Sequence, residues 1–201
     1  MTDTVAALVL AGGRARRMGV GDKPLLPVGG QPMIARVIAA LHPLPVAISA
    51  NGDPARFAAF GCPVLNDGPF EDQGPLAGLL AGMDWAAEGG AARLLTIPGD
   101  APFVPSGLAH RLCPAPACAA SGGRVHHLIA LWPISARDAL RSLLSRPGPR
   151  DVHHFAASIG MRRVDFPTGK WDPFTNVNTP EDLAAARALA EETGTESAIW
   201  P

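Results

Sequence analysis

The sequence has almost no net charge, few cysteines and no long apolar run. The 17 Lys and Arg residues balance 18 Asp and Glu residues, and the formal net charge is −1. Such a balance does not indicate a surface that binds nucleic acid. No apolar run reaches the ~18 residues that a membrane-spanning helix needs, and residues 1–13 lack the basic leader and small-residue cleavage site of a secretory signal. We therefore expect a cytoplasmic protein without nucleic-acid or membrane partners.

The cysteine and histidine spacings argue against the common metal frameworks. Cys62, Cys113 and Cys118 are odd in number and form no CxxC pair, so we expect reduced thiols rather than disulfides or a zinc site. The histidines include two adjacent pairs, at 126–127 and 153–154. Neighbouring residues point to opposite faces of a strand and diverge by about 100° on a helix, so neither pair predicts a helical metal site.

The length and the apolar pattern predict the class of fold. With 201 residues, 47% of them apolar, the chain can form one sizeable α/β domain. Apolar β-type runs alternate with helical patterns, which is typical of a mostly parallel sheet covered on both faces by helices. We predict a three-layer α/β/α fold over residues 1–193 and a frayed tail at 194–201. The expected strands are 5–10, 45–51, 63–67, 92–100, 127–133 and 162–167, and the expected helices are 32–41, 53–60, 74–87, 104–112, 135–145, 151–159 and 180–193.

Two of the predicted helices contain informative residues. The last has Thr179 as its expected N-cap and Pro180 at the first helical position. The helix over 74–87 carries glycines four residues apart, Gly74, Gly78 and Gly82, and each interior glycine costs about 1 kcal/mol relative to alanine. Either close packing of the helix on the sheet or close approach of a ligand offsets this cost.

Polar residues follow the predicted strands. Ligands of open parallel sheets bind beyond the carboxyl ends of the strands, so the connections after the strands are considered together. Asn51 follows the second strand, Asp67 the third and Asp100 the fourth. The segment LAGGRARRMGVGDKPLL (10–26) follows the first strand and contains Gly12, Gly13, Arg14, Arg16, Arg17 and Lys23. Together the connections predict phosphate donors, a base or ribose partner and a metal-type carboxylate at one edge of the sheet.

The residue types of segment 10–26 suit a polyphosphate. Glycines let the backbone approach a ligand closely, and successive amide groups form an anion-binding nest. Arg17 would bind phosphate through two parallel hydrogen bonds from its guanidinium group, and Lys23 would act as a mobile point charge. The spacing matches neither GxxxxGK[ST] nor GxGxxG. Taken by itself, the segment is explained equally well as a mobile surface loop with solvated cations.

Asp100 and the two asparagines near residue 177 each allow two interpretations. Asp100 lies in PGDAPF at a strand end, where it could accept backbone hydrogen bonds of a turn or bind a Mg²⁺ ion that bridges nucleotide phosphates. Asn176 and Asn178 are two residues apart, so they would project to one face of an extended segment. Alternatively, they would cap the turn that precedes Thr179.

Segment 10–26 resembles the signature loop of the molybdenum cofactor guanylyltransferases, nucleotidyltransferases with a Rossmann-like fold. Further segments resemble motifs of that family in the same order, so the resemblance spans nearly the whole chain. They are ISAN (48–51), LND (65–67), GPLAG (74–78), PGDAPF (98–103), HHLIAL (126–131) and NVNTPEDL (176–183). One departure is visible: the family usually reads MGGxDK, whereas residues 18–23 read MGVGDK.

The resemblance implies an activity and a set of site residues. The activity is transfer of GMP from GTP to the terminal phosphate of molybdenum-molybdopterin, with release of pyrophosphate and with Mg²⁺ as cofactor. Lys23, Asp100 and Arg17 would be catalytic, and Asp100 would bind the metal. The implied GTP-binding residues are Leu10, Ala11, Gly12, Gly13, Lys23, Asn51, Asp67 and Asp100, and those associated with the pterin or with activity are Gly74, Gly78, Asn176 and Asn178. Transient contacts with a molybdenum-inserting protein and with apo-molybdoenzymes are also implied, and we expect a monomer.

Other functions fit the sequence less well. A cytidylyltransferase acting on the same pterin tends to read LAAG where this chain reads LAGG (10–13). A sugar-1-phosphate or terpenoid-precursor nucleotidyltransferase is disfavoured by the short chain and by NVNTPEDL. A non-catalytic accessory protein that shelters the cofactor would not need both Lys23 and Asp100.

Overall fold

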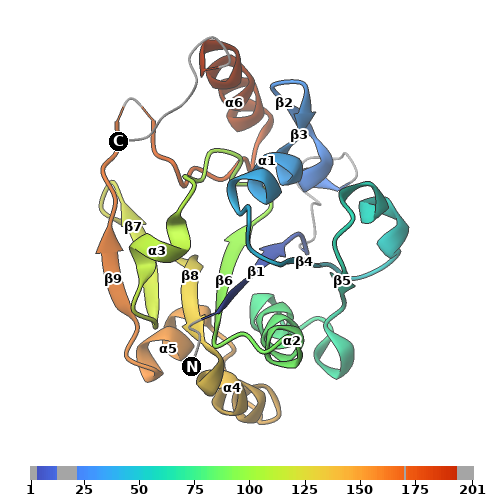
Figure 1. The fold of residues 1–201 in the computed structure, drawn as a ribbon, viewed down its shortest axis with the longest axis vertical. Helices are drawn as coiled ribbons and strands as arrows, with labels where there is room; N and C mark the ends of the chain where they lie inside the picture. Colours follow the sequence, from blue (N-terminus) through green and yellow to red (C-terminus); the bar gives the residue numbers. More distant parts are fainter. Residues whose placement is uncertain (1–3, 13–21, 170, 194–201) are drawn as a thin grey trace.

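The computed structural model describes residues 4–12, 22–169 and 171–193, which form a central sheet with helices on both faces (Figure 1). The sheet has seven strands in the order β5-β4-β1-β6-β8-β7-β9. These strands are β1 (Val5–Leu10), β4 (Val46–Ser49), β5 (Val64–Leu65), β6 (Arg93–Pro98), β7 (Ala117–Ser121), β8 (Arg124–Pro133) and β9 (Arg162–Asp165). Strands β5, β4, β1 and β6 are mutually parallel, β8 is antiparallel to β6 and β7, and β9 is parallel to β7. The predicted fold class is confirmed.

The alternation of side chains along β1 explains the two helical layers. Ala7 and Val9 belong to the core beneath α1 (Met33–Ala40) and α3 (Leu108–Leu112). Ala6 and Leu8 belong to the core beneath α2, α4 and α5 on the opposite face. Those three helices are α2 (Pro75–Glu88), α4 (Arg137–Leu144) and α5 (Val152–Ser158). Because successive strand residues point to opposite faces, a fully apolar strand indicates burial on both sides.

One strand of the central sheet was missed by the sequence prediction. β7 pairs with β8 and β9 and is fully buried, but its sequence ACAAS consists of small residues. Small residues lack the β-branched and aromatic side chains that mark a strand. The segment forms a strand because it pairs with β8 and β9, not because of a local preference for strand.

Several predicted bounds were too long. The helix expected over 104–112 begins only at Leu108, because Gly107 adopts φ +70° at its N-cap. The strand expected over 63–67 has two residues in β5. The helix expected over 53–60 is a 3-10 helix, η2 (Pro54–Phe60), and its predicted cap is confirmed, since Asp53 accepts a hydrogen bond from the Ala55 amide at 2.9 Å.

A small hairpin and the last helix pack together at one end of the molecule (Figure 1). The hairpin pairs β2 (Pro27–Val28) with β3 (Gln31–Pro32) and was not predicted. The last helix is α6 (Pro180–Thr193), and Thr179 caps it as predicted by accepting a hydrogen bond from the Asp182 amide at 3.1 Å. The remaining short elements are η1 (Lys23–Leu25), η3 (Gly68–Phe70) and η4 (Ile134–Ala136). The predicted tail at 194–201 lies outside the described residues.

A search of the described helices for a membrane span, which must be both long and apolar, finds none.

Helix α2 lies close to the sheet because of its glycines. A Cβ at Gly82 would stand 2.5 Å from Cδ2 of Leu8, a buried residue of β1. Such a distance leaves no room for a side chain. Close packing on the sheet therefore explains Gly82.

Candidate functional site

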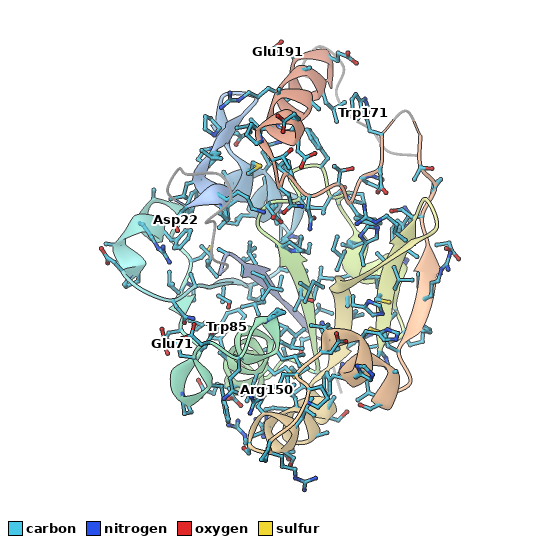
Figure 2. The ribbon with its side chains drawn as sticks, turned by 180° about the vertical axis from the view of Figure 1, so that it is seen from behind. Asp22, Glu71, Trp85, Arg150, Trp171 and Glu191 are labelled. Atoms are coloured by element: carbon cyan, nitrogen blue, oxygen red, sulfur yellow. The ribbon has the colours of Figure 1, made fainter. Side chains whose placement is uncertain are left out.

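A cavity of about 670 Å³ opens beside the carboxyl ends of β1, β4 and β5. Its volume is within the ordinary range for a small-molecule site. Figure 2 shows Asp22 and Glu71, two of its lining residues, on the same side of the molecule. The lining comprises Leu10, Ala11, Gly12, Asp22, Ser49, Ala50, Asn51, Arg56, Asp67, Glu71, Asp72, Gly74, Pro75, Gly78 and Leu128. The connections after β1, β4 and β5 thus meet at this cavity, whereas Asp100, which follows β6, is not among its lining residues.

Asn51 and Asp67 form two mutual hydrogen bonds in the wall of this cavity. Asn51 Nδ2 donates to Asp67 Oδ2 at 2.7 Å, and the Asp67 amide donates to Asn51 Oδ1 at 3.0 Å. Burial raises the pKa of the Asp67 carboxyl above its ordinary value, the hydrogen bond from Asn51 lowers it, and the charge of Asp72 raises it. The pair can present fixed acceptors to a ligand with N–H or hydroxyl donors.

The first glycines of α2 form another part of the lining. Gly74 is the N-cap with φ +74°, a conformation that favours glycine, and Pro75 occupies the first helical position. A Cβ at Gly78 would collide with Ser49 Oγ and would lie 3.4 Å from Asp67 Oδ1. Gly78 therefore serves helix packing and lines the cavity at the same time.

A second cluster joins Lys23, Asp100 and Asn178. The Lys23 ammonium contacts the Asp100 carboxylate and donates to Asn178 Oδ1 at 2.8 Å. Only 18% of the Lys23 side chain and 13% of the Asp100 side chain are exposed. The Val177 amide donates to the Asp100 carbonyl at 2.9 Å, which ties the segment before α6 to the end of β6. None of the three side chains lines the cavity, although Asp22, the neighbour of Lys23, does.

Asp182 supports this cluster from α6. Its Oδ2 accepts hydrogen bonds from the amides of Asn178 and Thr179, at 2.8 and 2.9 Å. These bonds, led by the one from Asn178, lower the pKa of the Asp182 carboxyl. Together with the Thr179 cap they form the reciprocal arrangement of a capping box.

Some predicted site residues are not brought together. Asn176 is exposed, and within the described part of the chain its side chain makes no hydrogen bond to either cluster. The cations Arg14, Arg16 and Arg17, the residue Gly13, and the departure at 20–21 lie outside the described residues.

Several residues of the site were not assigned to it from the sequence, and four of them make contacts that shape it. Asp22 and Arg56 are bonded to each other in the cavity wall, and Ser49 lies against Gly78. No local signal marks these three, because their contacts depend on how β4 and η2 sit beside the first connection. For Asp182 a signal existed: an acidic residue three positions after Thr179 is the capping-box spacing.

No cysteine or histidine is among the described residues that line the cavity. Cys62, Cys113 and Cys118 carry free thiols. His127 Nε2 and His153 Nδ1 are 3.2 Å apart, between β8 and α5. Across 4–12, 22–169 and 171–193, no group of three or more His, Cys, Asp or Glu residues is arranged to hold a metal ion.

The chain is similar to known proteins over most of its length. The family model of the MobA-like NTP transferase domain matches residues 7–159. A molybdenum cofactor guanylyltransferase of Acidiphilium cryptum is 55% identical over 184 residues, covering 90% of this chain and 93% of that protein. Another, from Bradyrhizobium sp., is 46% identical and covers 94% of each chain.

The fold is also similar to solved structures. Molybdopterin-guanine dinucleotide biosynthesis protein A from Archaeoglobus fulgidus superposes with a TM-score of 0.70 at 21% identity, covering 93% of this chain and 99% of that one. A nucleotidyl transferase from Methanothermobacter gives a TM-score of 0.74 at 20% identity, covering 95% and 99%. At these identities the likeness concerns the fold alone.

Proposed function

The chain belongs to the molybdenum cofactor guanylyltransferase family and is a nucleotidyltransferase, and we propose that it transfers GMP from GTP to the terminal phosphate of molybdenum-molybdopterin. The reaction releases pyrophosphate and takes place in the cytoplasm. The observation that carries the proposal is the Lys23 ammonium, held between Asp100 and Asn178 beside a cavity of nucleotide size.

The nucleoside half of GTP is proposed to lie in the cavity. Asn51 and Asp67 are fixed by their two mutual hydrogen bonds, so their remaining acceptor capacity faces a bound guanosine without reorganisation. Gly74 and Gly78 keep this wall free of side chains. Leu10, Ala11 and Gly12 supply the backbone wall at the end of β1.

The phosphate half is proposed to face Lys23. In the transfer, an oxygen of the pterin phosphate forms a bond to the α-phosphorus as the bond from that phosphorus to the bridging oxygen breaks, and pyrophosphate leaves. A phosphate monoester has its second pKa at about 6, so the attacking oxygen is already largely ionised at neutral pH. Lys23 stabilises the charge that develops on the phosphate oxygens, and Arg17 is proposed to add a second cation.

The donor set around Lys23 fits a hard cation. The carboxylate of Asp100 and the amide oxygen of Asn178 both contact the Lys23 ammonium group, and both are oxygen donors that could bind a metal ion. Mg²⁺ commonly uses one or two carboxylates together with substrate phosphates and water. Asp100 is proposed to hold the ion, which when bound would neutralise phosphate charge.

Pyrophosphate release tests the proposal directly. The purified protein is assayed with GTP, CTP, ATP and UTP, each with and without molybdenum-molybdopterin, in the presence of Mg²⁺. We expect release only with GTP and the pterin together, with formation of the guanine dinucleotide. Release with CTP instead would identify a cytidylyltransferase, and GTP binding without any release would identify a non-catalytic accessory protein.

A further inference from the structure

Among the residues that the structure describes, Arg56 is the only one with a cationic side chain that lines the cavity. The same lining contains the carboxylates of Asp22, Asp67, Glu71 and Asp72. The described part of this lining therefore carries more carboxylates than cations. The position of the one guanidinium therefore matters for a nucleotide.

The guanidinium of Arg56 joins two separate connections of the fold. Its Nη1 donates to Asp22 Oδ1, and its Nη2 donates to the backbone carbonyl of Asn51. Its Cζ lies 5.0 Å from the centre of the ring of Phe57, which is fully buried. Arg56 thus packs against the core, while its two terminal guanidinium nitrogens bind the connection after β1 and the connection after β4. Its Nε is buried and without a hydrogen-bond partner.

Each partner of Arg56 is adjacent to one half of the proposed GTP site. Asp22 directly precedes Lys23, whose ammonium contacts Asp100 and Asn178. Asn51 holds Asp67 through two hydrogen bonds. The guanidinium therefore connects the residues proposed for the phosphates to the residues proposed for guanosine.

We propose that Arg56 is a positioning residue for GTP. It holds Asp22 and Asn51 in a fixed position relative to each other, and it neutralises the charge of Asp22. This inference rests on the proposed function, because it concerns the same nucleotide. Without the guanidinium, the Asp22 carboxylate would stand unpaired at the cavity wall beside the phosphates. GTP affinity should fall more than the rate of the chemical step, because Arg56 acts through residues that bind the substrate.

The test compares Arg56→Met, Asp22→Asn and the double variant with the unmodified full-length chain. Methionine keeps an apolar stem over Phe57 but removes the guanidinium. We expect Arg56→Met to weaken GTP binding by about tenfold, measured by calorimetry, and to leave kcat within about threefold. Asp22→Asn keeps an oxygen acceptor, so its effect should be smaller. The double variant should bind GTP no more weakly than Arg56→Met alone, because both changes break the same contact.

Arg111→Met is the matched control. The Arg111 guanidinium also lies over an aromatic ring, with its Cζ 4.0 Å from the centre of Phe166, but Arg111 does not line the cavity. This variant should bind GTP as the unmodified protein does. A similar loss of GTP affinity in Arg111→Met would show that the loss comes from the change in net charge or in folding, and not from the position of Arg56.

The possible results separate this inference from the proposed function. Unchanged GTP affinity in Arg56→Met, with an unchanged melting temperature, would overturn the inference. If Arg56→Met does not fold, Arg56→Gln takes its place, and GTP affinity of that variant at the wild-type level overturns the inference equally. Absence of GMP transfer by the unmodified protein contradicts the proposed function, while GTP affinity still decides the role of Arg56. A chain that does not bind GTP at all contradicts both.

Discussion

Lys23 Nζ donates a hydrogen bond to Asn178 Oδ1 at 2.8 Å across 155 positions of the sequence, and the same ammonium contacts Asp100. The three residues come from the first connection, the segment before α6 and the end of β6. Because the ion pair is largely shielded from water, removing one partner leaves the other charge poorly compensated. Changes at these positions should therefore affect catalysis and binding in different proportions.

Asp100→Ala should abolish turnover. The substitution removes the carboxylate proposed to hold Mg²⁺ and leaves Lys23 without its anionic partner. We expect kcat for GMP transfer to fall by about a hundredfold to a thousandfold, which is the usual cost of losing one electrostatic group at a transfer site. Steady-state pyrophosphate release at saturating GTP and Mg²⁺ measures this.

Asp165→Ala provides the control for Asp100→Ala. Asp165 is an exposed carboxylate on β9 that pairs with Arg163, at an N–O distance of 2.5 Å. Exposed ion pairs contribute little, so this variant should keep full activity. Full GMP transfer by Asp100→Ala under saturating conditions would refute the metal role of Asp100.

Asn178→Ala should raise KM for GTP more than Asn176→Ala does. Asn178 holds Lys23, whereas the Asn176 side chain is exposed and makes no described contact with the cluster. Loss of one hydrogen bond costs about 0.5–1.5 kcal/mol, so we expect a rise in KM of about three- to tenfold. Initial rates over a range of GTP concentrations measure it. Equal effects of the two substitutions would mean that the Lys23 contact is not what makes Asn178 matter.

Gly78→Ala should destabilise the fold through Ser49. The added Cβ would collide with Ser49 Oγ, and overpacking of this kind costs about 1–3 kcal/mol, partly offset by the better helix propensity of alanine. Adding Ser49→Ala removes the colliding oxygen and should restore most of the lost free energy of unfolding. Urea denaturation of the single and double variants measures the recovery.

Gly82→Ala tests whether that recovery is specific. Its Cβ would collide with Leu8 rather than with Ser49, so Ser49→Ala should bring no recovery there. Equal recovery at both glycines would argue against a direct contact between residues 78 and 49.

The His127–His153 pair should make stability sensitive to acid. Burial lowers the pKa of His127 below its ordinary value of 6.5, and the charge of His153 lowers it further. The folded state then binds fewer protons than the unfolded state, so this contribution is complete above pH 6.5 and is lost as the pH falls below it. His127→Gln should therefore lose less unfolding free energy than the unmodified protein between about pH 7.5 and about pH 5.5.

His110→Gln serves as the comparison, because His110 is exposed at the end of α3. Its pH dependence in urea denaturation should follow that of the unmodified protein. If His127→Gln and the unmodified protein lose stability in parallel, the neutral form of His127 has no part in the acid sensitivity.

Local sequence was sufficient where a structural feature depends on neighbouring residues. The apolar run of β1 predicted burial on both faces, and Asp53 and Thr179 were identified as caps from the residues that follow them. Asn51 and Asp67 were chosen as candidates because each lies at the end of a predicted strand, and parallel strands bring their carboxyl ends to one edge. These inferences need only periodicity, capping chemistry and chain order.

Tertiary structure alone decided the contacts between distant segments. The small residues of β7 carry no strand signal and become a strand because β8 and β9 pair with them. Arg56 meets Asp22 only because η2 folds back beside the first connection. Likewise, the sequence marked Lys23, Asp100 and Asn178 as candidates, but only the packing of α6 and its preceding segment on the end of β6 places them on one ammonium group. Such contacts depend on the relative placement of whole elements, which local propensity does not encode.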